Sequence, residues 1–187
     1  MKMLYCGLSA VGKDFLLSQA ESEIERNDIT VVNFGEMLLS EVAGNTAIVD
    51  RDNLCSINEE LKDVAITRCL RRIAKIGSSV IVNSHLIVPN LDSFSSDMKS
   101  IKRLAPSFIG CVIADPESIH ERSKSDETRN RTVVDVSLLH ELQSIQKEIV
   151  VNLSDELDVG YSFIDNSSGN TEAAVCQLKR TIEEQVS

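Results

Sequence analysis

The sequence has little of several residue types, and each shortage excludes a class of protein. It has no Trp, two Tyr and five Phe among 187 residues, too few aromatic side chains for a platform on which single-stranded bases stack. With only three Pro and eight Gly, it is neither collagen-like nor broadly disordered. No apolar run approaches the roughly 20 residues that span a bilayer, and the first run is too short for a signal peptide. We therefore expect a globular protein with no membrane segment.

Cations are also scarce relative to anions. Nineteen Lys and Arg face 29 Asp and Glu, for a formal net charge of −10. An extended nucleic-acid surface needs a basic face, so the charge argues against one while leaving room for a small polyanion in a local pocket. No CxxC pair is present. We expect most cysteines to be reduced and buried, as in a cytoplasmic protein; they are Cys6, Cys55, Cys69, Cys111 and Cys176.

Short apolar strands alternate with helices along the whole chain. Strands are expected at 3–6, 29–33, 80–82, 108–114 and 161–164. Helices are expected at 13–26, 34–42, 57–76, 92–104, 135–153 and 170–185, and a further helix is expected to begin at 116. Nearly continuous apolar strands joined by helices are typical of a parallel sheet covered on both faces. The pattern predicts one α/β domain over residues 1–187, with a five-stranded, doubly wound parallel sheet.

Local signals refine these helices. Phe15 is expected on the buried side of the first helix, and Val64 in the apolar stripe of the third. Gly77 is expected to end the third helix as the glycine just beyond its C-cap. Asp115 and Pro116 predict a helix start, with Asp as the N-cap and Pro in the first helical position.

The clearest motif is the stretch Gly7–Asp14, which has the pattern G-x-x-x-x-G-K, follows a strand and opens a helix. In a phosphate-binding P-loop of this kind, backbone N–H groups and the helix N-terminus surround the phosphates, and Lys13 reaches the β- and γ-phosphates. The alternative is a chance pair of glycines at a strand–helix turn. We predict a nucleotide site formed by Gly7, Ser9, Ala10, Val11, Gly12, Lys13, Asp14 and Phe15.

Position 14 departs from the motif, which has Ser or Thr there to bind Mg²⁺. The carboxylate of Asp14 is itself a ligand for hard cations, but it adds negative charge beside the phosphates. Two interpretations stay open: Asp14 holds Mg²⁺, directly or through water, or it weakens the metal site of a degenerate enzyme.

Other stretches resemble the archaeal-type adenylate kinases, which are P-loop nucleoside monophosphate kinases. The matching stretches are Val31–Leu38, Asp50–Asp52, Arg71–Ala74, Val80–His85, Ala114–Ile119 and Asp126–Arg131. Their order and spacing carry the resemblance over about residues 1–185. It implies a P-loop NTPase fold with an acceptor-binding segment at about 34–76 and a short lid at about 122–134. It also implies ATP and Mg²⁺ as cofactors, and AMP as the default acceptor.

The resemblance suggests roles for individual residues. Besides Lys13, three lid residues are candidate clamps for the transferring phosphate, because Arg binds phosphate through a planar fork: Arg122, Arg129 and Arg131. The acceptor candidates are Gly35, Glu36, Arg51 and His85; the metal candidates are Asp14 and Asn83; Asn166 is a candidate beside the adenine.

Simpler explanations fit several of these residues. The lid stretch can be a solvated loop, Glu36 a first-turn acid favoured by the helix dipole, Arg51 a solvated loop residue, and His85 a structural hydrogen-bonding residue. Asn166 lies in a stretch whose composition suits a turn with a helix N-cap.

The chain also departs from the family on the acceptor side. Asn83 stands where the family has Asp at the end of the third strand, and an Arg expected near Cys55 is absent. The resemblance therefore supports ATP as a substrate better than AMP.

Taken together, the motif and the resemblance predict ATP-dependent phosphoryl transfer to a nucleoside monophosphate. Two alternatives remain: a nucleotide-binding regulator or partner subunit with weak or no kinase activity, and a kinase of another small acceptor. The expected partner is a small nucleotide, and the oligomeric state is left open.

Overall fold

The central sheet has five parallel strands in the order β2-β3-β1-β6-β7. The structure, a computed structural model, describes residues 1–24, 28–43, 58–89, 94–96, 98–125 and 133–187. The strands are β1 (Lys2–Cys6), β2 (Ile29–Asn33), β3 (Ser79–Asn83), β6 (Phe108–Ile113) and β7 (Gly160–Asp165). The predicted five-stranded parallel sheet is thereby confirmed.

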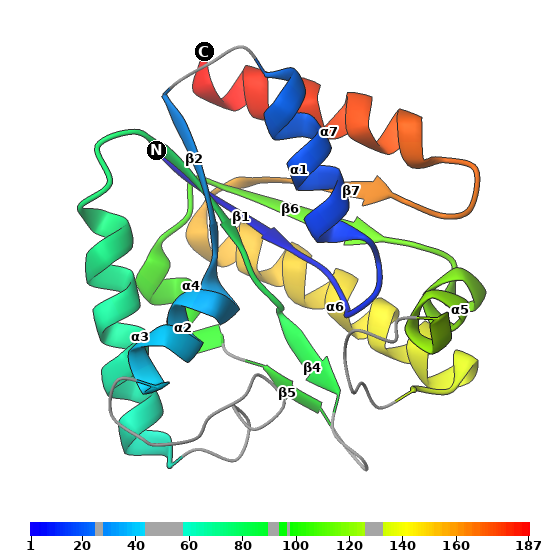
Figure 1. The fold of residues 1–187 in the computed structure, drawn as a ribbon, viewed down its shortest axis with the longest axis horizontal. Coiled ribbons are helices and arrows are strands. Elements are labelled where there is room, and N and C mark those ends of the chain that lie inside the picture. The colour runs from blue at the N-terminus through cyan, green and yellow to red at the C-terminus, as the bar shows by residue number, and fades with distance from the viewer. Residues whose placement is uncertain (25–27, 44–57, 90–93, 97, 126–132) are drawn as a thin grey trace.

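Helices cover both faces of this sheet (Figure 1). They are α1 (Lys13–Glu23), α2 (Phe34–Ala43), α3 (Glu59–Ala74), α4 (Met98–Leu104), α5 (Pro116–Ser125), α6 (Val136–Leu157) and α7 (Thr171–Val186). Side chains alternate along β1, because successive residues of a strand point to opposite faces. Met3 and Tyr5 enter the apolar cluster that includes α1 and α7, whereas Leu4 and Cys6 enter the cluster that includes α2 and α3.

A glycine in β6 makes room for the largest side chain of β1. Tyr5 and Gly110 are register partners on the adjacent strands, and a Cβ at Gly110 would lie 2.2 Å from the Cε1 atom of Tyr5. The Tyr5 ring is fully buried, and its hydroxyl has no hydrogen-bond partner among the described residues. Burial raises the pKa of Tyr5 well above its usual value.

A small antiparallel pair, which the sequence pattern does not predict, follows β3. β4 (Ile87–Pro89) pairs with β5 (Phe94–Ser96), with Ile87 opposite Ser96. The predicted helix over 92–104 is therefore wrong at 94–96, which form β5, whereas Met98–Leu104 is helical as α4. Three-residue strands are too short for a period of two to show in the sequence.

Three local expectations are also corrected. The Phe15 side chain is 54% exposed and that of Val64 is 47% exposed, so neither belongs to the buried stripe of its helix. α3 ends at Ala74, where the N–H of Lys75 donates to the carbonyl oxygen of Arg72 and the N–H of Ile76 donates to that of Ile73. Gly77 lies beyond this cap and does not have the positive φ of a C′ glycine.

The helix start at Asp115 is as predicted. Its Oδ1 atom accepts a hydrogen bond from the N–H of Ser118 at 2.7 Å, and α5 begins at Pro116. Hydrogen bonds from Ser118 lower the pKa of the Asp115 carboxyl below its usual value.

Four cysteines are described, and all have free thiols. Cys6, Cys69 and Cys111 are buried, whereas Cys176 is exposed. Cys6 and Cys111 are register partners on β1 and β6. The hydrogen bond between their thiols and their burial together raise the pKa of Cys6. Cys55 lies outside the described residues.

Within the described ranges, no helix combines the length and apolar character needed to cross a membrane.

Candidate active site

The G-x-x-x-x-G-K motif forms the loop between β1 and α1, at the edge of the sheet where the parallel strands end (Figure 1). Ala10 and Gly12 have left-handed backbone conformations, with φ of 64° and 84°. A Cβ at Gly7 would lie 2.8 Å from the carbonyl oxygen of Val112, so the first glycine lets the loop pass close to β6. A curled loop of this kind at a helix N-terminus is suited to binding phosphate.

Lys13 is buried, with 5% of its surface exposed, in the first turn of α1. Its Nζ atom lies 3.9 Å from Oδ1 of Asp14. The same Oδ1 atom accepts a hydrogen bond of 2.6 Å from the side-chain amide of Asn83, at the end of β3. The structure therefore brings together the lysine and both residues predicted to hold a metal.

This pair of side chains fits the chemistry of a magnesium site. Asp14 offers a carboxylate and Asn83 an amide oxygen, both hard oxygen ligands, and the two side chains are in direct contact. Among the described residues there is no cluster of three His, Cys, Asp or Glu side chains that could hold a metal ion. The donor set present suits a cation that is also held by phosphate oxygens.

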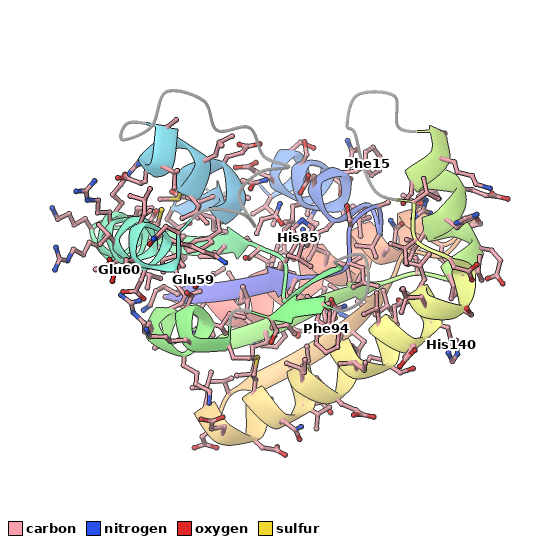
Figure 2. The ribbon with its side chains drawn as sticks, turned by 90° about the horizontal axis from the view of Figure 1, so that it is seen from below. Phe15, Glu59, Glu60, His85, Phe94 and His140 are labelled. Atoms are coloured by element: carbon pink, nitrogen blue, oxygen red, sulfur yellow. The ribbon has the colours of Figure 1, made fainter. Side chains whose placement is uncertain are left out.

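His85 connects the P-loop with a neighbouring pocket. Its Nδ1 atom donates to the carbonyl oxygen of Gly7 at 2.9 Å. The same residue lines a small pocket, together with apolar side chains that include Phe34 and Val82 and the polar Ser84 and Ser100. Figure 2 shows His85 between α1 and the sheet. One residue, His85, therefore contacts the first glycine of the phosphate loop and also lines this pocket.

On its other side the P-loop is held by two long-range contacts. The side-chain amide of Asn166, in the loop after β7, donates to the carbonyl oxygen of Val11 at 2.7 Å. Arg122 of α5 reaches the same oxygen through Nη1 at 3.3 Å and the carbonyl oxygen of Asn166 through Nη2 at 2.9 Å. Asn166 is almost fully buried, and its side chain packs under the P-loop. A role in an ordinary turn therefore does not account for this residue.

Sequence analysis does not anticipate the polar contacts between α5 and the loop after β7. The N–H of Asp115 donates to Oγ of Ser167 at 2.8 Å. The hydroxyl groups of Ser118 and Ser168 lie 2.7 Å apart. The only sequence signal is the run of Asp, Asn and Ser at 165–168, which is equally typical of an ordinary turn. These contacts fix the position of the loop that carries Asn166.

Comparison with known proteins identifies the family. A model of a family described as AAA domain (AAA_17) matches residues 6–140, a range that contains the P-loop, His85 and Arg122. The chain belongs to this family.

Relatives of this chain include archaeal adenylate kinases. One from Methanothermobacter thermautotrophicus is 23% identical and covers 87% of this chain and 90% of its own. One from Saccharolobus solfataricus is 22% identical, with 92% and 94% covered. One from Thermoplasma acidophilum is 23% identical, with 97% and 98% covered. The predicted resemblance to archaeal-type adenylate kinases is confirmed.

Solved structures show the fold of this AAA domain. Shikimate kinase from Bacteroides thetaiotaomicron matches with a TM-score of 0.58 at 13% identity, over 98% of both chains. A sugar kinase from Janibacter sp. HTCC2649 matches with a TM-score of 0.54 at 13% identity, over 97% of this chain and 94% of that one. The P-loop kinase fold is confirmed, and with the family and the relatives it identifies the chain as a phosphotransferase.

The remaining predicted site residues lie in α1, α2 and α5 or outside the described residues. Gly35 and Glu36 lie in the first turn of α2, where the N–H of Glu36 donates to Oδ1 of Asn33 at 3.2 Å. Phe15 projects from the first turn of α1 on the side that faces α5 (Figure 2). The beginning of the predicted lid, including Arg122, is the last part of α5. Arg51, Arg129 and Arg131 lie outside the described residues.

Proposed function

We propose that the chain transfers the γ-phosphoryl group of ATP to a nucleoside monophosphate, with AMP as the first acceptor to test. One observation carries this proposal: His85 bonds the first glycine of the phosphate loop and also lines the adjoining pocket. Donor and acceptor sites that share a residue can hold two substrates for direct transfer, because such a reaction needs the reacting groups close and aligned.

The donor site supports ATP. The loop backbone and the N-terminus of α1 would hold the phosphates, and the buried ammonium group of Lys13 would bind the β- and γ-phosphates. Asp14 and Asn83 would hold Mg²⁺, which when bound neutralises charge on the phosphate oxygens. The loop around Asn166, fixed by Arg122, would contact the adenine through its backbone.

The pocket beside His85 supports a nucleoside as the acceptor. Its walls are mainly apolar side chains from the sheet and from α2, α3 and α4, which a planar base would contact once the space between them opens. Ser84, His85 and Ser100 add polar groups that can orient it. We assign Gly35, Glu36 and Arg51 to the same acceptor side. Arg129 and Arg131 would surround the transferring group, because Arg holds a phosphate through two parallel hydrogen bonds.

The free thiols fit a reducing compartment, and we propose the cytoplasm.

A kinase of another small acceptor is the second candidate. The fold is shared with a shikimate kinase and a sugar kinase over almost the whole chain, so the same scaffold carries acceptors that are not nucleotides. A nucleotide-binding regulator with weak activity is the third candidate, since Asp14 and Asn83 replace the expected metal ligands.

One assay separates these candidates. Purified protein is incubated with Mg-ATP and each of AMP, CMP, GMP, UMP and shikimate, and formation of ADP and phosphorylated acceptor is followed by chromatography. We expect rapid turnover of one nucleoside monophosphate. Turnover of shikimate alone favours the second candidate. Calorimetric binding of Mg-ATP with no turnover of any acceptor favours the regulator. A reaction without acceptor measures background hydrolysis.

A further inference from the structure

We propose that Asp14 makes nucleotide binding by this chain depend on a divalent cation, so that the P-loop accepts the metal complex of a nucleoside triphosphate and rejects the metal-free nucleotide. This inference rests on the proposed donor site. It assigns Asp14 as a specificity-determining residue for the form of the donor, a role that a Ser or Thr at the same position would not have.

The first step is the position of the carboxylate. Asp14 follows Lys13 directly, and its side chain is 51% exposed while that of Lys13 is 4% exposed. The carboxylate therefore lies at the open side of the loop, and the ammonium group lies below it. Nucleotide that approaches Lys13 must come close to Asp14.

The second step is that the carboxylate is held in place. Asn83 is buried at the end of β3, and its side-chain amide donates to Asp14 at 2.6 Å. This hydrogen bond stabilises the carboxylate at the mouth of the loop and limits its rotation away from an incoming anion. The ion pair with Lys13, in which Nζ lies 3.9 Å from Oδ1 of Asp14, also holds the carboxylate in place.

The third step is the electrostatic consequence. A phosphate that binds Lys13 at hydrogen-bond distance would lie within a few ångströms of the Asp14 carboxylate, where like charges repel strongly even at a partly exposed site. It would also have to share the ammonium group that Asp14 already contacts. Asp14 would hold a divalent cation through its carboxylate, and the positive charge of that cation would offset the repulsion between carboxylate and phosphate.

A Ser or Thr at position 14 carries no charge and would impose no such repulsion. We therefore expect Asp14 to weaken the binding of metal-free ATP by about tenfold or more relative to an uncharged residue. The binding of Mg-ATP should change less, because the carboxylate then gains a cation as its partner.

The test measures ATP affinity by isothermal titration calorimetry, once with Mg²⁺ in excess and once with EDTA. The variants are Asp14→Asn, which keeps the shape and an acceptor for Asn83, and Asp14→Thr, which introduces a hydroxyl. Glu21→Gln serves as the matched control, because it removes one negative charge from an exposed position of the same helix. A thermal melt of each protein confirms that it is folded.

For the wild-type protein and Glu21→Gln we expect Mg-ATP to bind at least about a hundredfold more tightly than metal-free ATP. In Asp14→Asn and Asp14→Thr that ratio should fall about tenfold or more, chiefly through tighter binding of metal-free ATP. An unchanged ratio in both variants overturns the inference, as does equal binding of the two forms by the wild-type protein. If the wild-type protein binds neither form, the proposed donor site itself is refuted and the inference falls with it.

Discussion

Arg122 donates a hydrogen bond of 2.9 Å to the carbonyl oxygen of Asn166. These residues are far apart in the sequence, in α5 and in the loop after β7. The same guanidinium group also reaches the carbonyl oxygen of Val11 in the P-loop. One side chain thus holds together the three segments that form the donor side of the site. We infer a positioning role for Arg122 from these contacts, and its role as a phosphate clamp stays a prediction.

Replacement of Arg122 should loosen the donor site. In Arg122→Ala the carbonyl oxygens of Val11 and Asn166 lose a charged donor, a loss worth roughly 1.5–3 kcal/mol per bond at well-ordered sites. We expect Mg-ATP affinity to fall about tenfold, with a lower melting temperature, and Arg122→Lys to recover little because it lacks the planar fork. Arg68→Ala, at an exposed position of α3, is the control. Wild-type affinity in Arg122→Ala would contradict the positioning role.

Lys13→Ala should remove most ATP binding. The ammonium group is buried at the start of α1, where its contacts with phosphate would be charge-assisted. We expect the affinity for Mg-ATP to fall about a hundredfold or more, as measured by calorimetry. Lys147→Ala, at an exposed position of α6, should bind like the wild-type protein. Retained binding in a folded Lys13→Ala protein would refute the P-loop as the nucleotide site.

Gly110→Ala should destabilise the fold. Its Cβ would lie 2.2 Å from the Tyr5 ring, so the ring or the strand must move within a packed core. We expect a loss of about 1–3 kcal/mol or more in the free energy of unfolding, measured by urea denaturation. The matched control is Gly77→Ala, where a Cβ would meet no atom within 4 Å. Adding Tyr5→Leu to Gly110→Ala should be less costly than the sum of the two single changes, and strict additivity would argue against the clash.

The N-cap of α5 should contribute a pH-dependent stability. Because the hydrogen bonds from Ser118 lower the pKa of Asp115 in the folded protein, its carboxylate stabilises the fold above the unfolded-state pKa of about 3.9. That contribution is lost as the pH falls through the lower, folded-state pKa. Thermal melts across pH should therefore show the wild-type protein more stable than Asp115→Asn at neutral pH, with the difference shrinking below about pH 4. A difference independent of pH would contradict this origin.

Sequence patterns predict the parts of the molecule that depend on local chemistry. The glycines and Lys13 of the P-loop, the apolar strands and the Asp115 cap each have a short-range signal, and the structure contains them. The contact between Asp14 and Asn83 follows from the rule that parallel strands end at one edge of the sheet.

Contacts between residues far apart in the sequence are not predicted by such local patterns. The contacts of Arg122 and Asn166 with Val11 join residues more than 100 positions apart, and no periodic pattern carries that information. The β4–β5 pair is too short to show alternation. Phe15 lies beside the buried Leu16, so its exposure depends on a small rotation of α1 relative to the sheet.

The paired thiols of Cys6 and Cys111 give the protein an internal reporter of motion. They occupy neighbouring positions on β1 and β6, in the apolar cluster that includes α2 and α3, and Cys6 lies directly before the P-loop. Reagents that alkylate thiols can reach them only when the helices over this face of the sheet move away, whereas Cys176 is exposed. The delay between the labelling of Cys176 and that of the buried pair therefore reports how often these helices uncover the strand that leads into the phosphate loop.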